Sequence, residues 1–589
     1  MYHTRINTDK QARDLVVYLL KLPEVAVDSE TDGFEWQTGN MFFLQFADRY
    51  HCWIVDIRRV DVQIFKPLFE SKTVKKIIHN SAFDCSWLAR EFNIWTINIH
   101  DSRYQEQVIL GIALQRGLTK AMKAALEPKY SASLRWCFHR RGWEDKEEFK
   151  PFYALPWEPD DDQVHYMVHD VDMLIHLYED QVATIDSMGL GNVSTLENEI
   201  SRITYSMMVN GFGVDVTGWL AYTAQQEEEY NEIMQRLSIA VPGLNWQSPK
   251  QYCNFFGVSR TAQLDELTED DYLEVDFIND RWLVLQDFRR TRELYKNVTT
   301  YGRSFIDKYV INGELHCGYT QMVNTARYSS DSPNMQNLPS ESAHRSFIRS
   351  TRFAKGWTLV RADFSGQEMA IIAYGSQEPS WLHCLRTGGD LHSMVAADII
   401  DGWNNLDKKT QARVRRIVKI INFSIAYGAG ADTIAKRAGT TVEDIRVKLA
   451  TMRRKYPKVF RWLNDNARSA KRTYESRSFA PFNRYRSLAM ETEGWRRENI
   501  GKNNPVQATA ADMSKLAMLY FQIEIDNGLP ARLIHMEHDE LITDCHQSDS
   551  ELVAEVLKQC MTQSCIDILE ESLSSPDVTI SMSWDKRKG

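Results

Sequence analysis

The pattern that most restricts the fold is a pair of strand-like segments on either side of a long helix-rich region. WTLVRADFSG, at 357–366, is an apolar run that ends in a turn, and ARLIHMEHDELITDC, at 531–545, alternates as a β-hairpin does. Helical patterns fill most of 377–480, and a further helix is predicted near 505–525. Strands on both sides of a helical insertion predict one sheet interrupted by a helical lobe.

The N-terminal third has a different pattern. Residues 1 to about 185 mix strand and helix patterns, and a mainly helical arm follows. A chain of 589 residues with this organisation is expected to form two or more folding units. The predicted strands lie at 25–30, 42–47 and 74–80, and the predicted helices at 162–180, 196–238 and 281–309.

Composition narrows the class of protein. The chain is 43% hydrophobic and 25% charged, as soluble globular proteins are, and its N-terminus resembles no secretory signal, so we expect a cytoplasmic protein without a membrane span. The nine cysteines show no CxxC pair or metal-ligand spacing, so reduced thiols are expected. The net charge of −10 argues against nucleic-acid binding, but the basic run KKTQARVRRIVK at 408–419 offers a local phosphate-binding surface.

A first set of acidic residues is predicted to gather in the N-terminal unit. Asp28 and Glu30 stand two apart on a predicted strand, so both side chains point to one face. Asp84 lies in an apolar helical context, and Tyr166 and Asp170 share one face of a helix. A lone DxE is most often a solvated strand edge. Together, however, the four carboxylates are suited to hold two Mg²⁺ ions, and the phenol is suited to hold an attacking water.

A second set of acidic residues lies far downstream. Asp363 stands at the end of an apolar strand and is followed by Glu368, while Asp539 and Glu540 stand at the turn of the predicted hairpin. Each acid alone is more often an ordinary turn residue. One sheet can bring a strand end and a hairpin tip side by side, which is the arrangement that phosphoryl transfer with two metal ions requires.

A third feature is a stripe on the predicted helix around KIINFSIAYG, at 419–428. Arg415, Lys419, Phe423 and Tyr427 are four residues apart, so they fall on one helical face. The ordinary interpretation is an amphipathic helix whose aromatic rings pack inward and whose basic side chains reach the solvent.

Three segments, in order, resemble motifs A, B and C of the family A (polymerase I-like) DNA polymerases: LVRADFSGQE, RRIVKIINFSIAYG and HMEHDELI. NTARYSSDSPNMQNLP, GGDLHSMVA and NNPVQATAAD resemble further segments of that family, and the N-terminal acids resemble those of the DEDDy-type 3′-to-5′ exonucleases. The resemblance covers nearly the whole chain. It implies an α/β multidomain protein, in which an RNase H-like exonuclease domain precedes a right-hand polymerase domain of palm, fingers and thumb.

The resemblance also implies domain boundaries. The exonuclease domain is expected at 1–190 and the polymerase domain at 191–589. Because few residues precede Asp28, we expect no 5′-nuclease domain, which suits a bacteriophage replicative enzyme; a trimmed bacterial repair enzyme is the alternative. Within the polymerase, the thumb is expected at about 215–308, the palm at 191–214, 309–376 and 503–589, and the fingers at 377–502.

Roles for the acidic residues follow from the resemblance. In the exonuclease, it implies metal binding by Asp28, Glu30, Asp84 and Asp170, with Tyr166 positioning the water. In the polymerase, it implies metal binding by Asp363, Asp539 and a backbone oxygen near Phe364, with Glu540 close to the primer end. Two Mg²⁺ ions are expected in each site, with Mn²⁺ as a substitute.

The resemblance implies a role for each residue of the stripe. Arg415 and Lys419 are expected to bind the triphosphate, with Lys419 donating a proton to the leaving pyrophosphate. Phe423 is expected to lie against the sugar and base, and Tyr427 beside the template base. Glu368 resembles the steric gate against a 2′-hydroxyl, and His392 is expected to touch the phosphates. The expected DNA contacts are Arg327, Asn334, Gln336, Asn503 and Gln507, and Asn499 stands where the family often has Arg.

The expected partners are primer-template DNA, deoxynucleoside triphosphates and replisome proteins such as a helicase-primase and a single-strand-binding protein. A monomer is expected, in the host cytoplasm if the chain is phage-encoded. Three alternatives remain: a nuclease whose polymerase half only grips DNA, a single-subunit RNA polymerase, and a purely structural DNA-binding protein. Asp363, Lys419 and Asp539 argue against the first, and Glu368 and the exonuclease residues argue against the second.

Overall fold

The chain is described here by a computed structural model, which covers residues 2–114, 118–144, 146, 150–259, 261, 264, 267, 278–339 and 342–585. It forms two compact units, and each is discontinuous in sequence. Part of the predicted thumb, 268–277, lies outside the described residues. The first unit consists of Met1–Asn210, Cys317–Gln336 and Leu359–Ile580, and the second of Gly211–His316, Asn337–Thr358 and Ser581–Gly589.

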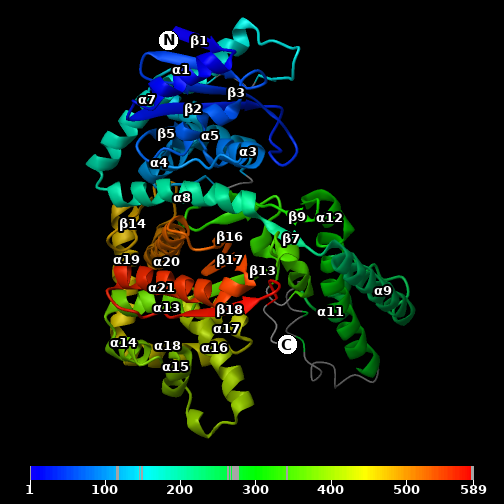
Figure 1. Cartoon of the computed structure of the whole chain (residues 1–589). Helices are drawn as coiled ribbons and strands as arrows, with labels where there is room; N and C mark the ends of the chain where they lie inside the picture. Colours follow the sequence, from blue (N-terminus) through cyan, green and yellow to red (C-terminus); the bar gives the residue numbers. More distant parts are fainter. Residues whose placement is uncertain are drawn as a thin grey trace. The chain divides into compact units, whose positions relative to one another are not determined.

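A six-stranded mixed sheet organises the N-terminal part of the first unit (Figure 1). Its strand order is β1-β4-β3-β2-β5-β6, with antiparallel β2–β3 and β3–β4 pairs and parallel pairs elsewhere. The sequence MFFLQFA of β3 is buried on both faces, which explains why it is a nearly continuous apolar run. The strands are β1 Tyr2–Ile6, β2 Glu24–Thr31, β3 Met41–Ala47, β4 His51–Asp56, β5 Lys75–Ile78 and β6 Ile99–Asp101.

The long helix α7 packs on this sheet and carries the predicted Tyr166 and Asp170. Its start is fixed by a capping box, in which Asp160 accepts from Gln163 N (2.8 Å) and Gln163 Oε1 accepts from Asp160 N (2.9 Å). Buried apolar side chains of α7 join the core of the sheet. The helices here are α1 Asp9–Leu19, α2 Lys66–Phe69, α3 Ala82–Phe92, α4 Ser102–Leu110, α5 Lys120–Tyr130, α6 Leu134–Arg140 and α7 Asp161–Ser187.

A second sheet, of order β16-β17-β13-β18, confirms the prediction of strands that are interrupted by a helical insertion. β16 and β17 form the predicted antiparallel hairpin, closed by the Glu537–Glu540 pair. His538, in the turn, has a φ of 57°, a left-handed conformation that is uncommon for a side-chain-bearing residue. The strands are β13 Trp357–Phe364, β16 Ala531–Glu537, β17 Glu540–His546 and β18 Pro576–Ser581.

Helices surround this sheet and fill the insertion between β13 and β16 (Figure 1). The helix predicted near 505–525 begins earlier, at Gly494, and continues through Pro505. The elements are α8 Gly191–Asn210, α13 Gln367–Ser376, α14 Pro379–Arg386, α15 Leu391–Ile399, α16 Lys408–Ala426, α17 Ala431–Ala438, α18 Val442–Lys455, α19 Pro457–Thr473, β14 Glu475–Arg477, β15 Tyr485–Ser487, α20 Gly494–Asp526 and α21 Ser550–Leu569, with β10 Gly318–Thr320 paired to β11 Ser329–Asp331.

A buried ionic cluster fixes α20 against α8. Lys515 Nζ lies 2.6 Å from Glu197 Oε1, and Arg484 Nη2 lies 2.6 Å from both Glu197 Oε1 and Asp512 Oδ1. Two positive charges therefore balance two negative charges, which is the condition under which buried ions are tolerated. Because the cluster holds α20 two turns beyond Gln507, it also sets the position of that predicted DNA contact.

The second unit pairs a helical hairpin with a small sheet of order β12-β7-β9-β8. Residues 196–238 are predicted to be helical, and most of them are, but the short strand β7 interrupts the helical pattern. Gly211 has a φ of +54°, and a Cβ there would lie 2.5 Å from the His316 ring, so the chain turns at this glycine. The elements are β7 Phe212–Val214, α9 Val216–Ala240, α10 Pro249–Phe256, α11 Ile278–Thr300, α12 Arg303–Tyr309, β8 Val310–Ile311, β9 Glu314–Leu315 and β12 Ile348–Arg349.

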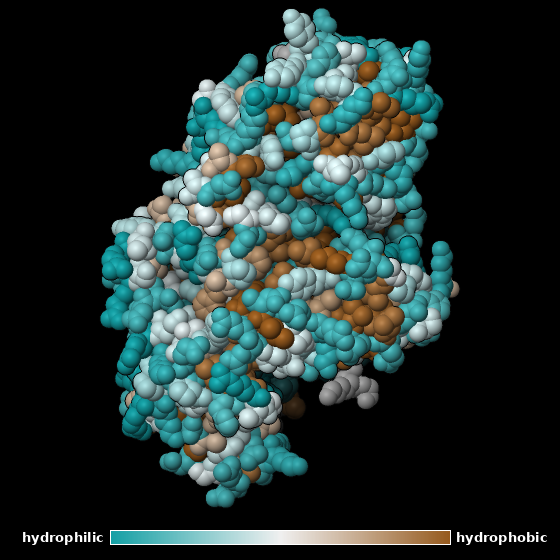
Figure 2. All heavy atoms as spheres, turned by 60° about the vertical axis from the view of Figure 1, so that its left-hand side comes forward, coloured by the Kyte–Doolittle hydropathy of each residue, from teal (hydrophilic) through white to brown (hydrophobic). Residues whose placement is uncertain are grey.

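The face that Figure 2 shows is mainly hydrophilic, with separate hydrophobic areas. Among the described residues, no helix is long and apolar enough to cross a membrane. All nine cysteines are free and buried.

Candidate active sites

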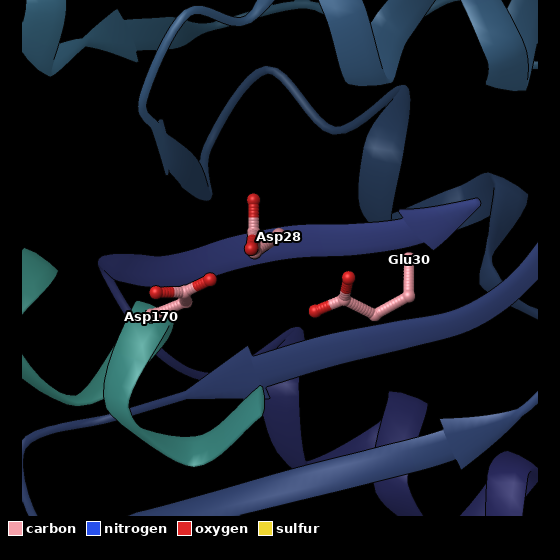
Figure 3. Close-up of side chains that lie close together, drawn as sticks. All are labelled: Asp28, Glu30 and Asp170. Atoms are coloured by element: carbon pink, nitrogen blue, oxygen red, sulfur yellow. The ribbon is translucent and has the colours of Figure 1, made fainter. Parts of the chain in front are cut away.

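Three carboxylates from two elements meet beside the N-terminal sheet (Figure 3). Asp28 and Glu30 lie on one face of β2, as their spacing predicts, and Asp170 comes from α7. One oxygen of each lies within 4.8 Å of an oxygen of the others. Glu30 is 4% exposed and Asp170 is 1% exposed, so water screens their mutual repulsion only weakly. A cation between these oxygens would relieve the repulsion, so the group could hold a metal ion.

The acidities of these residues reflect the same repulsion. Burial, together with the neighbouring carboxylates, raises the pKa of Asp28 and of Glu30 well above their ordinary values. Burial also raises the pKa of Asp170, although Lys146 acts in the opposite direction. Hard divalent cations bind such carboxylate oxygens, so the residues fit the Mg²⁺ site that the sequence predicts.

Asp84 lies near this group, but it is not one of the three residues whose carboxylate oxygens lie within 4.8 Å of one another. It stands in the first turn of α3, and its Oδ1 accepts a hydrogen bond of 2.5 Å from Ser29 Oγ. Burial raises the pKa of Asp84 to about 7. The structure thus brings together three of the four predicted ligands and holds the fourth beside them through Ser29.

Tyr166 lies one turn before Asp170 on α7 and is buried, as the helical spacing predicts. Burial and the nearby Asp170, Glu30 and Asp28 raise the pKa of its phenol, so the hydroxyl keeps its proton at neutral pH. A protonated phenol can donate to, or accept from, a water beside the carboxylates.

Lys146 is a site residue that sequence reasoning missed. Its Nζ lies 2.5 Å from Asp170 Oδ2 and 5.1 Å from the centroid of the Tyr166 ring. The sequence around it, WEDKEEFK, reads as an ordinary charged surface run, so no local pattern separates this lysine from its neighbours. Its role depends on a fold that brings residue 146 to residue 170.

One of the clustered carboxylates, Asp28, lines a cleft of about 900 Å³. Asp28 and Lys146 line it together with Phe34, Arg103 and Arg135. An aromatic ring and several cations along one cleft suit a strand of nucleic acid, because bases stack on rings and phosphates pair with cations.

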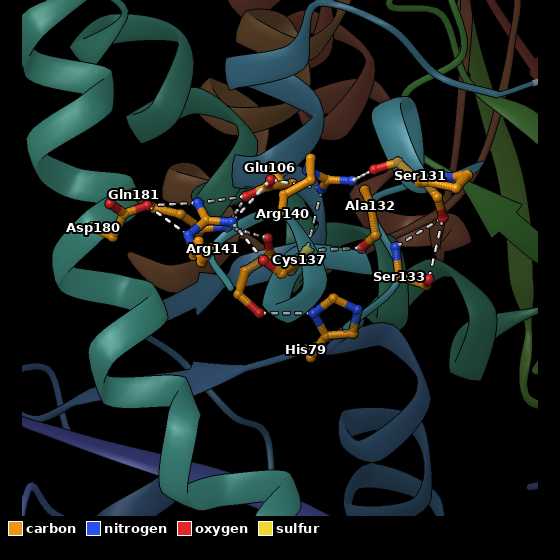
Figure 4. Close-up of polar contacts among 12 residues, drawn as sticks. His79, Glu106, Ser131, Ala132, Ser133, Cys137, Arg140, Arg141, Asp180 and Gln181 are labelled. Atoms are coloured by element: carbon orange, nitrogen blue, oxygen red, sulfur yellow. Dashed lines mark hydrogen bonds and ion pairs between the residues drawn. The ribbon is translucent and has the colours of Figure 1, made fainter. Parts of the chain in front are cut away.

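Buried ion pairs around Glu106 hold one wall of the cleft (Figure 4). Glu106 accepts from Arg140 Nη2 (2.7 Å), Arg141 Nη2 (3.1 Å) and Gln181 Nε2 (2.9 Å). The two arginines end helix α6, and Arg135 near its start lines the cleft. Because Glu106 is buried with two cationic partners, α6 is fixed relative to α4 and α7.

The second set of acids meets in the sheet that carries the hairpin. Asp363 is the last residue but one of β13, and Asp539 stands in the hairpin turn. Phe364 N donates to Asp539 O (3.3 Å). Both aspartates line one cavity of about 760 Å³. The structure therefore brings together two residues that are 176 positions apart (539 − 363). Asp577 of β18, which sequence reasoning missed, lines the same cavity.

Helix α16 faces this cavity with the predicted stripe. Arg415, Lys419 and Phe423 all line it, and the Lys419 Nζ lies 5.9 Å from the Phe423 ring centroid. His392 of α15 also lines it, and burial lowers its pKa to about 4, so the imidazole is neutral at pH 7. The Asn422 side chain donates to His392 Nδ1 (3.0 Å). Two aspartates thus stand in one cavity with two basic side chains.

Tyr427 follows α16 and joins a polar network that includes two lining residues of the cavity, Arg327 and Glu368. Its hydroxyl lies 3.0 Å from Glu368 Oε1 and accepts from Gln507 Nε2 (2.9 Å). Arg327 Nη2 also donates to Glu368 Oε1, at 2.5 Å. Four predicted residues from four segments therefore form one connected network, with Glu368 at its centre.

The remaining predicted residues lie further from the cavity lining. Glu540 is buried on β17, 3.7 Å from Arg361 Nη1, and does not line the cavity. Asn334 is exposed, whereas the Gln336 side chain donates to Met536 O (3.1 Å). Asn503 is partly buried on α20, one turn before Gln507. Asn499 lies against Gly428, where an added Cβ would be 2.4 Å from Asn499 Oδ1.

Comparisons with known protein families agree with this geometry. The family model described as DNA polymerase family A matches residues 220–586, and the model described as 3′-5′ exonuclease matches residues 3–180. The chain belongs to DNA polymerase family A. The matched ranges place the two carboxylate groups in two family domains, the first in the exonuclease domain and the second in the polymerase domain.

Relatives within family A are bacterial proteins named DNA polymerase I. The chain is 23% identical over 600 residues to the DNA polymerase I of Aquifex aeolicus, and the match covers 96% of each chain. It is 31% identical over 259 residues to the DNA polymerase I of Deinococcus radiodurans. It covers 26% of the Deinococcus protein and 44% of the Caldicellulosiruptor bescii protein, to which it is 27% identical. The chain therefore spans less than half the length of these two relatives.

A solved structure shares the fold of this family A chain. It is the POL domain of Pol1 from M. smegmatis in complex with DNA primer-template and dNTP. The TM-score is 0.80 at 18% identity, with 99% of each chain covered. The likeness supports the fold of an exonuclease domain followed by a family A polymerase domain.

The raised pKa of the exonuclease acids predicts how pH affects stability. Asp84 has a pKa of about 7 in the folded chain, against an ordinary value of 3.8. Between these values the metal-free folded state holds a proton that the unfolded chain has lost, so the free energy of unfolding falls as pH rises. Divalent ions bind the ionised carboxylates, so added Mg²⁺ should raise the melting temperature more at pH 8 than at pH 5.5.

This dependence is measured by thermal unfolding in EDTA and in Mg²⁺, in a variant with Asp363→Ala and Asp539→Ala so that only the exonuclease site responds. Adding Asp28→Asn and Glu30→Gln should remove the difference between the two pH values. An equal effect of Mg²⁺ at both pH values would contradict the prediction.

Proposed function

We propose that the chain is a template-directed DNA polymerase that extends a primer with deoxynucleoside triphosphates and proofreads with its 3′-to-5′ exonuclease domain. One observation supports the proposal: Asp363, Asp539 and two basic residues of α16, Arg415 and Lys419, line one cavity although they come from three separate segments. Carboxylates opposite cationic side chains suit a triphosphate whose reacting phosphorus must be held between metal ions and the protein.

The polymerase residues fit a pair of divalent ions, because Asp363 and Asp539 offer hard oxygen ligands in a cavity that also admits a nucleotide. When bound, the ions lower the pKa of the primer 3′-hydroxyl and neutralise the leaving pyrophosphate. Asp363, Asp539 and the backbone oxygen of Phe364 would hold them.

The side chains of α16 would then bind and orient the nucleotide. The Arg415 guanidinium can hold two phosphate oxygens at once, and Lys419 can donate a proton to the departing pyrophosphate oxygen. Phe423 offers a ring face for the sugar and base. His392, being neutral, can act as a hydrogen-bond donor to a phosphate oxygen rather than as a cation.

Glu368 is proposed to select the sugar. It is 8% exposed and is held by Arg327 and Tyr427, so it cannot swing away from a 2′-hydroxyl without leaving both partners. The same contacts connect it to Gln507, which is proposed to test the minor groove of the new base pair.

In the exonuclease domain, Asp28, Glu30, Asp84 and Asp170 are proposed to hold divalent ions, which supply an activated water when bound. Tyr166 is proposed to orient that water through its protonated hydroxyl. The cleft with Phe34 and Arg103 would take the unpaired 3′ end of the primer.

Primer extension tests the function directly. With Mg²⁺, four deoxynucleoside triphosphates and a primed template, the chain should extend the primer to the template end. Degradation without extension would favour a nuclease that only grips DNA, and primer-independent incorporation of ribonucleotides would favour an RNA polymerase. Tight duplex binding without either reaction would favour a structural DNA-binding protein.

Phe423 predicts discrimination against dideoxynucleotides. The phenylalanine ring lacks a hydroxyl that could replace the missing 3′-hydroxyl of a chain terminator. Phe423→Tyr should therefore increase the relative incorporation of dideoxynucleotides by about 10- to 100-fold, the effect of one hydrogen bond in a desolvated site. The ratio is measured by competition with normal nucleotides on one template. Equal use of both substrates by the unaltered chain would contradict the prediction.

The biological setting is also a proposal. We infer a role in genome replication, with a helicase-primase and a single-strand-binding protein as partners. The named relatives are bacterial, so phage origin stays a prediction from the arrangement of domains.

A further inference from the structure

Asp390 lies in the polymerase cavity and has no role among the residues discussed so far. It caps the N-terminus of α15, where its Oδ2 accepts from Ser393 N (3.1 Å) and Ser393 Oγ (2.5 Å). It lines the same cavity as Arg415, Lys419 and Asp539. An acidic side chain at this position is unexpected, because the substrate of this cavity carries several negative charges.

Asp390 binds the arginine that the triphosphate needs. Arg415 Nε donates to Asp390 Oδ2 (2.6 Å) and Arg415 Nη2 donates to Asp390 Oδ1 (2.8 Å). This two-point contact uses the Nε–Nη2 edge, one of the two edges of the guanidinium that can hold a pair of phosphate oxygens. Although burial opposes it, the bonds from Arg415 and Ser393 lower the pKa of Asp390 well below its usual range, so the carboxylate is charged at neutral pH.

The pair is placed where an incoming anion can displace it. The Arg415 and Asp390 side chains are 43% and 38% exposed, so the contact is neither sealed in the core nor fully solvated. Lys419, one turn along the same face of α16, has no carboxylate within ion-pair distance in the part of the chain that the structure describes. Of these two predicted phosphate-binding residues, Arg415 is therefore the one that already forms an ion pair with a carboxylate.

We propose that Asp390 competes with the triphosphate for Arg415, so that it lowers nucleotide affinity and promotes release of pyrophosphate. This inference rests on the proposed polymerase function. The carboxylate and the phosphates cannot both occupy the Nε–Nη2 edge of one guanidinium. Breaking the Asp390–Arg415 pair therefore weakens nucleotide binding. The pair forms again when the pyrophosphate leaves, which favours its release.

Asp390→Asn removes the charge while keeping a side chain that caps helices well, so α15 should remain intact. We expect the dissociation constants of the deoxynucleoside triphosphate and of pyrophosphate to fall by about 3- to 10-fold, as expected when a partly exposed ion pair no longer competes. Asp390→Ser, which also caps helices, should give the same direction. Ser393→Ala is the matched control, because it removes a contact to Asp390 and leaves the ion pair.

The dissociation constants are measured by single-turnover incorporation and by pyrophosphate inhibition, with thermal unfolding as a check on folding. In an Arg415→Gln background, Asp390→Asn should have no further effect, since the competed group is gone. Unchanged or weaker nucleotide binding in both Asp390 variants would overturn the proposal. So would equal tightening in the Arg415→Gln background, which would reveal a general charge effect. Failure of the unaltered chain to extend a primer would instead refute the polymerase function.

Discussion

Replacing Asp363 or Asp539 with Ala is expected to lower the rate of primer extension by about 10³-fold or more. Each aspartate is proposed to hold a divalent ion in the polymerase cavity, and metal ions supply several kcal/mol of stabilisation to phosphoryl transfer. The rate is measured in single-turnover extension of a primed template with Mg²⁺.

The same variants should degrade single-stranded DNA at the rate of the unaltered chain, because the exonuclease acids lie in a different domain. Asp401→Ala, at an exposed position in the same unit, is the matched control and should leave extension unchanged. Loss of both activities together would contradict two separate sites.

Changing Asp28 and Glu30 to Ala is expected to lower the exonuclease rate by about 10³-fold or more, by the same argument. Two of the three clustered carboxylates are then missing, and Asp170 alone is left with Lys146. The error rate of DNA synthesis should rise, because misinserted nucleotides are no longer removed. Degradation is measured on a labelled single strand, and errors are measured by sequencing the products.

Asp172→Asn is the matched control for this experiment. Asp172 lies on α7 two residues after Asp170 and has no proposed role, so its variant should degrade DNA normally. An unchanged mismatch frequency in the Asp28 and Glu30 variant, despite lost degradation, would argue against proofreading.

The sequence predicts those parts of the sites that depend on local periodicity. Asp28 and Glu30 share a face because strand side chains alternate, and Tyr166 and Asp170 share a face because a helix turns every 3.6 residues. The hairpin that carries Asp539 follows from alternation, and the stripe on α16 follows from four-residue spacing. Each of these predictions needed only a few neighbouring residues.

The parts that were missed depend on contacts between distant segments. Lys146 and Asp170 are brought together by the fold, and so are Asp390 and Arg415; the residues around them show no pattern that announces the pairing. The break at β7 was missed because the helical pattern continues on both sides of it, and only Gly211 marks the turn. The bond from the Tyr427 hydroxyl to Glu368 joins residues 59 positions apart, so the four-residue spacing of the stripe does not predict it.

The central claim is that Asp363 and Asp539 together hold two divalent ions opposite α16. Anomalous diffraction from crystals grown with Mn²⁺, primed template and a non-hydrolysable nucleotide tests it most directly. We predict two Mn²⁺ peaks about 4 Å apart, each touching a carboxylate oxygen of these aspartates. Carboxylate oxygens more than about 10 Å apart in that complex, too far to share such a pair of ions, would contradict the account.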